Sequence, residues 1–351
     1  MPFSEKRCKP LPAESSFHSW AAAGRKREEE TRRDLTVAAM LRLPQLLVTL
    51  VGLLLGRAEV FFDTFRNTGC ARFFYKGAEP SSGLVPQSAA WICQRYGNQY
   101  HFATLFDNKN RIPVYSAYIY QPGPGPRADW FIEPQLVDMS FNKSMENESS
   151  TKIDRQKLED SQAVSTDYKQ TSQTYDRGHL SPNLHHSIQT SKTATFTLTN
   201  IVPQHNKLNQ GSWNAYEAKT MPNKTAGCDV TYALVGAISG SEQISEGRVN
   251  VPSHIWAAAC CIQSGGLKAW AAIAENSAKN EVKVTSVGDL EKEVSKLLNR
   301  NVQLFHDECP RVSDFNSFIL REDKRPSNDA QSSSFCLNII FILAAITVFH
   351  F

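Results

Sequence analysis

Two blocks of polar residues about thirty positions apart do most to constrain the fold of this 351-residue chain. The first block, 175–183, reads YDRGHLSPN, so that an acid, an arginine and a histidine are close neighbours. The second block reads TNIVPQ from Thr199 and LNQGSWNAYE from Leu208. Side chains of these kinds bind phosphodiesters, activate water and hold hard cations. We therefore expect the fold to bring both blocks together in one hydrolytic site.

Each of these residue types suits one step of phosphodiester hydrolysis, which needs a base, a positive partner for the phosphoryl oxygens and relief for the leaving oxygen. His179 suits the base because the ordinary pKa of histidine lies near neutrality. Arg177 presents a fork of donors that matches phosphate. Asn209 offers a neutral oxygen to Mg²⁺. Glu217, two turns further along the same predicted helix, is expected to orient the waters of that cation.

The same residues also have purely structural explanations. An adjacent Asp176 and Arg177 are often a salt bridge, and a single histidine is more often a surface or core residue than a catalyst. Asn209 is also a candidate helix N-cap, and Trp213 is a candidate core residue. The combination of the two blocks therefore carries the prediction, rather than any single residue.

Charge is unevenly distributed along the chain. Residues 1–58 contain 10 Lys or Arg and 6 Asp or Glu, whereas residues 59–334 contain 28 and 29. The body of the protein is therefore almost neutral, and its bulk charge gives no support for nucleic-acid binding. An apolar content of 41% and a charged content of 21% fit a globular protein with a sizeable core.

The N-terminal 58 residues are not predicted to belong to the folded domain. Residues 1–39 are polar and are expected to be disordered or not translated. Residues 40–58 have a short basic start at Met40, an apolar run at 46–55 and Gly-Arg-Ala at 56–58, which is typical of a signal peptide. The run is short for a membrane span, although a signal anchor is the alternative.

The C-terminal residues 326–351 combine a small polar spacer with an apolar run that begins at Phe335. This pattern resembles a lipid-anchor attachment signal, whose tail is removed. A short tail anchor and a buried C-terminal helix remain open alternatives. Residues 59–325 are accordingly predicted to form the folded domain.

Two further patterns indicate the secretory pathway, and hence an extracellular or cell-surface location. Asn142, Asn147 and Asn223 each open a triplet that accepts an N-linked glycan in a secreted protein. An even number of cysteines between the two apolar runs fits disulfides in an oxidising compartment, although the sequence cannot choose the pairing. These six are Cys70, Cys93, Cys228, Cys260, Cys261 and Cys309.

Strand and helix patterns interleave irregularly, which favours one α+β domain. Residues 101–120 predict a hairpin, and 194–199, 230–238, 254–262 and 268–274 predict further strands. Helices are expected near 154–164 and after a capping pattern at Ser286. A further helix is expected over 208–220, with Pro222 ending it.

The order of the motifs resembles the DNA/RNA non-specific endonuclease family, which includes the Serratia-type nuclease and endonuclease G. The likeness rests on Asp-Arg-Gly-His at 176–179, Asn-x-x-Pro-Gln at 200–204 and Asn-x-x-x-Trp-x-x-x-Glu at 209–217. Additional likeness to a vertebrate branch, at 73–77, 92–96, 102–105 and 111–116, extends it over residues 60–310.

This resemblance implies a ββα-metal active site on a core of αβα layers, with antiparallel sheets flanked by helices. It also implies that His179 is the general base and Asn209 the direct ligand of one Mg²⁺, for which Mn²⁺ is a possible substitute, while Glu217 orders water. The substrate is then the backbone of DNA, RNA or both.

The resemblance assigns less central roles to four more positions. Arg177 and Arg111 contact substrate phosphate or the charge that develops on it. Asp176 positions its neighbours, and Asn200 hydrogen-bonds near the site and the substrate.

The sequence departs from the family pattern after the histidine, where Ser181-Pro182 and then His185-His186 replace the usual Ala-Pro and a downstream Asp. Because no proposed catalytic residue is lost, a metal-dependent endonuclease is the prediction. The alternative is a nuclease-like surface glycoprotein that has lost catalysis and binds a partner. A zinc site made by the neighbouring histidines and cysteines lacks ordered ligand spacing.

Overall fold

The computed structural model describes residues 59–125, 128–169, 171, 173–312 and 318–321. The predicted leader at 40–58 and the apolar tail at 335–351 both lie outside the described residues. Within the described part, no helix has the length and apolar character that crossing a membrane requires.

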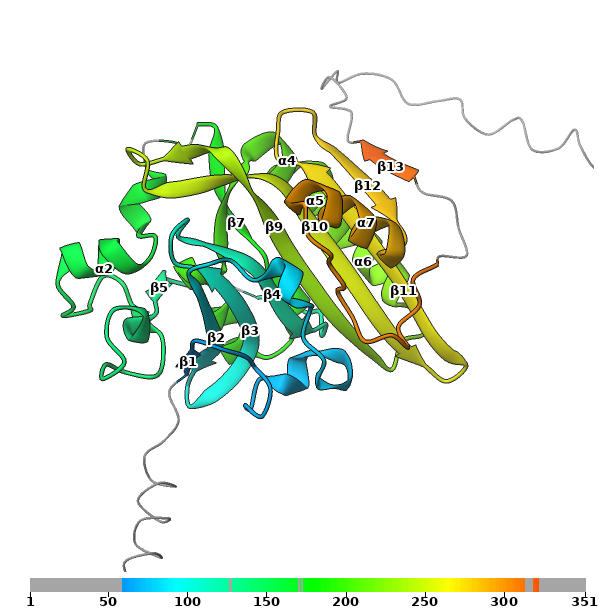
Figure 1. Ribbon diagram of the computed structural model, residues 1–351, viewed down its shortest axis with the longest axis horizontal. Helices are drawn as coiled ribbons and strands as arrows, with labels where there is room; N and C mark the ends of the chain where they lie inside the picture. Colours follow the sequence, from blue (N-terminus) through cyan, green and yellow to red (C-terminus); the bar gives the residue numbers. More distant parts are fainter. Residues whose placement is uncertain (1–58, 126–127, 170, 172, 313–317, 322–351) are drawn as a thin grey trace, which may run out of the picture. The chain divides into compact units, whose positions relative to one another are not determined.

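A nine-stranded sheet forms the centre of the described domain, and every neighbouring pair of its strands is antiparallel (Figure 1). In spatial order the strands are β1 (Val60–Phe61), β2 (Ala89–Tyr96), β3 (Gln99–Asp107), β4 (Ile112–Ile119), β9 (Val230–Ile244), β10 (Val249–Gln263), β11 (Gly266–Glu275), β12 (Glu281–Thr285) and β13 (Phe318–Arg321).

Both faces of this sheet are buried, because successive side chains of a strand point to opposite sides. On β10, Ile255 and Ala257 pack into one hydrophobic core, whereas Trp256 and Ala258 pack into another. The central strands therefore read as nearly continuous apolar runs rather than as an alternation. This explains why 230–238, 254–262 and 268–274 predicted central strands, which the structure confirms.

One face of the sheet is covered by a two-stranded ribbon and by short helices. The ribbon pairs β7 (Tyr175–His179) with β8 (Ile201–His205). The helices are α3 (Gln189–Ala194), α4 (Asn206–Gln210), α5 (Ser212–Ala215), a π-helical turn (Tyr216–Thr220) and α6 (Met221–Thr225). Buried side chains such as Leu208, Trp213 and Tyr216 attach this layer to the sheet.

The opposite face is covered by α7 (Val287–Leu298) and by 3₁₀ turns at Ala71–Phe73, Tyr75–Gly77 and Ser82–Leu84. Ser286 caps α7 by accepting a hydrogen bond from the backbone of Asp289, as the capping pattern predicted. The predicted α+β class, with an antiparallel sheet between helical layers, is confirmed.

A separate excursion contains β5 (Phe131–Ile132), β6 (Glu146–Asn147) and α2 (Arg155–Ser161). Helix α2 confirms the helix predicted near 154–164. Further 3₁₀ turns lie at Pro134–Leu136, Ser165–Tyr168, Asn183–His185 and Leu198–Asn200.

All six predicted cysteines form disulfides, as expected for an oxidising compartment. The pairs are Cys70–Cys93, Cys228–Cys261 and Cys260–Cys309. The last two pairs start from adjacent residues of β10 and therefore leave the sheet on opposite faces.

Two sequence predictions about secondary structure are wrong. Residues 194–199 are not a strand, because they join the end of α3 to the 3₁₀ turn Leu198–Asn200. The threonines at 195, 197 and 199 are buried at every second position, which imitates the alternation of a strand. The helix predicted over 208–220 is interrupted at Gly211 and continues beyond Pro222, which occupies the first turn of α6. Proline fits there because the amides of a first helical turn do not bond within that helix.

Candidate active site

Strand β7 carries the first predicted block. Because side chains alternate along a strand, Arg177 and His179 project from one face of β7, and Asp176 and Gly178 from the other. Opposite Asp176 on β8 lies Gln204, from the second block. A Cβ atom on Gly178 would lie 2.2 Å from Oε1 of Gln204, so a larger residue does not fit there. The two motifs therefore interlock sterically.

Arg177 is held between two aromatic rings. Its guanidinium carbon lies 5.1 Å from the ring centre of Trp130 and 5.4 Å from that of Tyr168, within the range of cation–π contacts. Its Nη2 donates a 2.9 Å hydrogen bond to the carbonyl oxygen of Ser165. Burial lowers the pKa of Arg177 from its usual value, although an arginine stays charged at neutral pH.

His179 shares the same aromatic neighbour. Its ring centre lies 5.7 Å from Trp130 and 5.1 Å from Phe196. Trp130 thus contacts both predicted catalytic side chains of this face. Sequence reasoning missed Trp130, since it lies in a loop about fifty residues before His179 and belongs to no motif.

On the other face of β7, Asp176 binds the amides of helix α4. The side-chain nitrogens of Asn209 and Gln210 each donate to Oδ2 of Asp176 at 2.9 Å. An amide whose nitrogen is turned to a carboxylate keeps its oxygen directed elsewhere. Asp176 therefore fixes the orientation of Asn209 and leaves Oδ1 of that residue as the atom that can act as a ligand.

Gly211 separates the helix of Asn209 from the helix of Glu217. Its φ and ψ of −103° and −117° are not helical, and a Cβ atom there would lie 2.4 Å from Oδ1 of Asn280. The same Asn280 oxygen accepts a 2.7 Å hydrogen bond from the backbone of Ser212, which opens α5. The regular helical spacing that was predicted between Asn209 and Glu217 is therefore wrong, because the chain changes direction between them.

Glu217 is oriented by its own helix. Its Oε1 accepts a 3.0 Å hydrogen bond from the indole nitrogen of Trp213, one turn earlier. Burial raises the pKa of Glu217 to about 8, and the hydrogen bond from Trp213 opposes that shift. Trp213 is thus both the core residue that was expected and a support for the carboxyl group.

The oxygen of Asn209 and the neighbouring carboxylate of Asp176 fit a hard cation that keeps most of its waters, as Mg²⁺ does. Within the described residues, no three His, Cys, Asp or Glu side chains gather closely enough to form a metal cage. A cation at this place would therefore depend on the amide oxygen and on water rather than on a dedicated protein cage.

A family model described as DNA/RNA non-specific endonuclease matches residues 80–301, which include both blocks. The chain belongs to this family. It is 34% identical to the human endonuclease domain-containing 1 protein over 288 residues, which cover 80% of this chain and 53% of that protein. The mouse protein of the same name is 32% identical over 273 residues, which cover 75% and 52%. The chain spans about half the length of the curated relatives it matches.

A solved structure of the EndoG/EndoGI complex is also similar. The alignment covers 70% of this chain and 93% of the chain in that structure, with a TM-score of 0.45 and 17% identity. At that level the likeness adds nothing to the family assignment, which rests on the sequence matches.

The endonuclease-family fold places Asn200 in the core rather than at the substrate. Its side chain is fully buried, and its Oδ1 accepts hydrogen bonds from Ser116 Oγ and the Ser181 backbone, each at 2.9 Å. Its Nδ2 donates to the carbonyl oxygens of Ser181 and Thr195. The expected contact between Asn200 and substrate is therefore corrected: this residue ties the segment after His179 to the central sheet.

Arg111 is also engaged elsewhere. Its Nε, Nη1 and Nη2 donate to the carbonyl oxygens of Glu159, Arg248 and Asp160, respectively. These bonds join the β3–β4 turn to the end of α2 and to the β9–β10 turn. The structure therefore does not bring Arg111 to the other site residues, and its predicted phosphate contact is replaced by a structural role.

The three predicted glycan acceptors lie at accessible positions of the fold. Asn142 is exposed, Asn147 lies half-buried in β6 and Asn223 is exposed in α6. Glycosylation itself stays a prediction.

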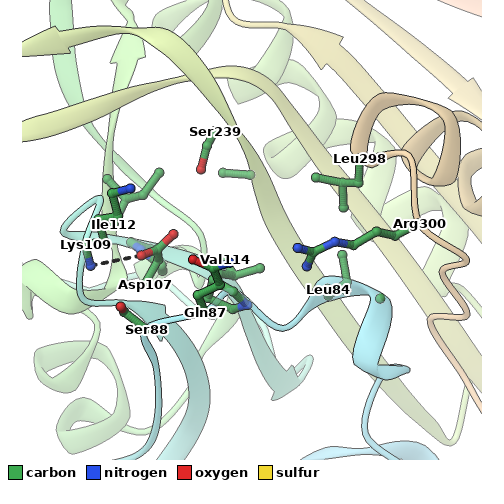
Figure 2. Close-up of a pocket in the computed structure, with 14 residues that line it drawn as sticks. Leu84, Gln87, Ser88, Asp107, Lys109, Ile112, Val114, Ser239, Leu298 and Arg300 are labelled. Atoms are coloured by element: carbon green, nitrogen blue, oxygen red, sulfur yellow. Dashed lines mark hydrogen bonds between the residues drawn. The ribbon is translucent and has the colours of Figure 1, made fainter.

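A hollow of about 250 Å³ lies away from these residues (Figure 2). Its walls come from 83–88, the β3–β4 turn, β9 and the end of α7, and Figure 2 shows the Arg300 side chain reaching into it. Neither block contributes a side chain to this hollow. The candidate active site is therefore assigned to β7 and α4, with Arg177 and His179 on one face of β7 and the Asp176–Asn209 pair on the other.

Proposed function

We propose that this chain is a metal-dependent endonuclease that hydrolyses phosphodiester bonds of DNA, RNA or both without sequence specificity. The observation that carries the proposal is the orientation of Asn209, whose amide nitrogen is bound by Asp176 so that its oxygen is available to Mg²⁺. Membership of the DNA/RNA non-specific endonuclease family supports it.

The protein side chains divide the reaction as follows. An imidazole nitrogen of His179 takes a proton from the attacking water while the bond from water oxygen to phosphorus forms and the bond from phosphorus to the 3′ oxygen breaks. Arg177, which its aromatic neighbours hold in place, donates to the non-bridging oxygens as their negative charge grows. The leaving 3′ oxygen takes a proton from solvent.

Asn209 would hold the cation, for which Mn²⁺ is a substitute, and Glu217 would order the water beside it. Mg²⁺ would supply Lewis-acid stabilisation of the charged transition state and of the departing 3′ oxygen. Contacts to the phosphate backbone alone carry no sequence information, which accounts for the lack of base selectivity in the proposal.

The decisive experiment is cleavage of supercoiled plasmid and of single-stranded RNA by the purified protein. We expect nicking with Mg²⁺ or Mn²⁺, none with EDTA, and a loss of about a hundredfold or more in His179→Ala, consistent with removal of a general base. His254→Ala is the matched control, because His254 lies on β10 and belongs to neither block. Equal activity of wild type and His179→Ala would reject the catalytic assignment.

Complete inactivity of the folded wild type would instead favour the alternative function, a nuclease-like glycoprotein that binds a partner. The nearly neutral charge of residues 59–334 is the observation that favours this alternative. Binding of a labelled oligonucleotide without cleavage would then define the ligand.

We also propose that the protein acts in the secretory pathway, outside the cell or at the cell surface. The three disulfides support this location, because such bonds persist in oxidising compartments. Membrane attachment through the C-terminal segment belongs to the same proposal. Expression in secretory cells, followed by glycosidase treatment and N-terminal sequencing, tests it. A product that stays cytosolic and carries no glycan would contradict it.

A further inference from the structure

The helix that carries Glu217 contains a backbone oxygen without its helical donor. In the π-helical turn the amide of Met221 donates to the carbonyl oxygen of Tyr216, five residues earlier. The next amide in that pattern would come from residue 222 and would serve Glu217. Residue 222 is a proline and has no amide hydrogen. The carbonyl oxygen of Glu217 therefore needs a partner from outside the helix, since a buried backbone acceptor is costly to leave alone.

His185 supplies that partner. Its Nε2 lies 3.1 Å from the carbonyl oxygen of Glu217, and its Nδ1 lies 2.8 Å from the hydroxyl oxygen of Tyr118 on β4. A carbonyl oxygen only accepts, so Nε2 must carry the hydrogen. In a neutral ring Nδ1 is then the acceptor, and the tyrosine hydroxyl donates to it. Two hydrogen bonds thus run from the central sheet through one imidazole to Glu217.

The surroundings of His185 keep it in this state. The side chain is 1% exposed, and burial lowers its pKa to about 4, so the ring is neutral at physiological pH. Tyr118, His185 and Glu217 also line one small enclosed cavity beneath the helix. A Tyr120 ring packs edge-on against the imidazole at 4.7 Å between centres. These contacts allow the imidazole a single orientation.

We infer that His185 is a positioning residue of the active site, which holds Glu217 in place through its backbone while Trp213 holds the carboxyl group. This inference rests on the proposed function for the role of Glu217, but the two hydrogen bonds stand independently of it. His185 touches neither substrate nor cation in this scheme. It sets the place of the Glu217 carboxyl group, which would order the water.

The neighbouring His186 provides a matched control. It is equally deep, with 4% of its surface exposed, and its Nε2 lies 2.8 Å from the Ser181 hydroxyl. Its ring contacts Phe102, Tyr118 and Ser181, none of which lies on the helix of Glu217. A change at His186 therefore reports the cost of disturbing a buried histidine in this segment without moving Glu217.

The test compares His185→Leu, His185→Gln and His186→Gln in the full chain. Glutamine at position 185 keeps a nitrogen donor near the place of Nε2, whereas leucine removes it. We expect His185→Leu to lower kcat by about ten- to a hundredfold with little change in KM, as is typical when a supporting partner of a metal site is lost. His185→Gln should retain most of the wild-type kcat, and His186→Gln should leave kcat of the folded protein unchanged.

A readout without catalysis separates this inference from the proposed function. The indole hydrogen of Trp213 is bonded to Glu217, so its NMR resonance reports the position of the carboxyl group. It should shift in His185→Leu and stay in His186→Gln, and nitrogen shifts of His185 should show hydrogen on Nε2. If the wild type fails to cleave nucleic acid, the proposed function falls and these shifts still decide the role of His185. An unmoved indole resonance in His185→Leu would overturn the inference.

Discussion

Asn209, in the helix that follows β8, donates its side-chain amide to Oδ2 of Asp176 near the start of β7, across 2.9 Å. The same oxygen receives the amide of Gln210, so two donors fix one carboxylate atom. This relationship joins the two sequence blocks chemically and leaves Oδ1 of Asn209 as the atom that could bind the proposed cation.

Replacing Asp176 by Asn should therefore weaken metal binding without unfolding the protein. An amide at position 176 offers a donor as well as an acceptor, so Asn209 loses its fixed orientation. We expect Mg²⁺ or Mn²⁺ affinity to fall by about ten- to a hundredfold, as for other residues that orient a ligand. Titration calorimetry with Mn²⁺ measures it, with exposed Asp229→Asn as the control. Unchanged affinity would mean that Asp176 does not orient the ligand.

Trp130 should matter to catalysis although no motif contains it. Its ring contacts both the Arg177 guanidinium and the His179 imidazole. A partly buried cation–π contact contributes about 1–2 kcal/mol, so Trp130→Leu should lower kcat/KM by about five- to thirtyfold. Trp130→Phe keeps an aromatic ring and should lose less. Steady-state kinetics on a short oligonucleotide distinguish the two variants, and equal losses would point to packing alone.

Gly211→Ala should disconnect the two halves of the site. The new methyl group would meet Asn280 Oδ1 and the Lys207 carbonyl oxygen, each at 2.4 Å. Overpacking of this kind costs about 1–3 kcal/mol, so the melting temperature should fall by several degrees and activity should fall further than stability explains. Gly265→Ala is the control, since nothing lies within 4 Å of a Cβ there. Identical melting curves for both variants would contradict the expected clash.

Glu133 should make stability depend on pH. Burial raises its pKa in the folded protein to about 8, opposed by a hydrogen bond from Thr197 and assisted by nearby Glu59. The unfolded chain releases this proton near its ordinary pKa, so the folded state binds more protons between about pH 4.5 and 8. Stability therefore falls as pH rises through that window, by at most about 1.4 kcal/mol per pH unit from this group.

Glu133→Gln removes the titration, so its melting temperature should exceed that of wild type increasingly from pH 5 to pH 8. The buried His185 and His186 have lowered pKa values and act in the opposite direction, with stability lost as pH falls below their ordinary value. Wild type and Glu133→Gln share this loss of stability at low pH, so the difference between their melting temperatures reports Glu133 alone. Parallel curves would contradict the shift.

The part of the site that could be predicted from the sequence is the part that lies within one short segment. Asp176, Arg177 and His179 lie on one strand, and Asn209 and Glu217 lie within nine residues of each other, so their spacing reflects their chemistry. The central strands and α7 were predictable because burial on two faces or on one helical face leaves a periodic pattern.

What could not be predicted depends on contacts between distant segments. Trp130 reaches the site through the fold of a loop, and its local sequence has no pattern that shows this. Arg111 and Asn200 carry polar groups that suit substrate as well as they suit backbone carbonyls, and only burial and partners distinguish the two uses. The break at Gly211 needs Asn280 from the β11–β12 turn to explain it.

The disulfides of the adjacent Cys260 and Cys261 depend on the register of β10. The two cysteines point to opposite faces of β10, so each can meet its partner, Cys309 or Cys228, only when β10 has its native register. A slip by one residue would exchange the two thiols and turn every apolar side chain of the strand to the wrong side. Formation of both disulfides therefore requires the native alignment of β10, the strand against which both layers pack.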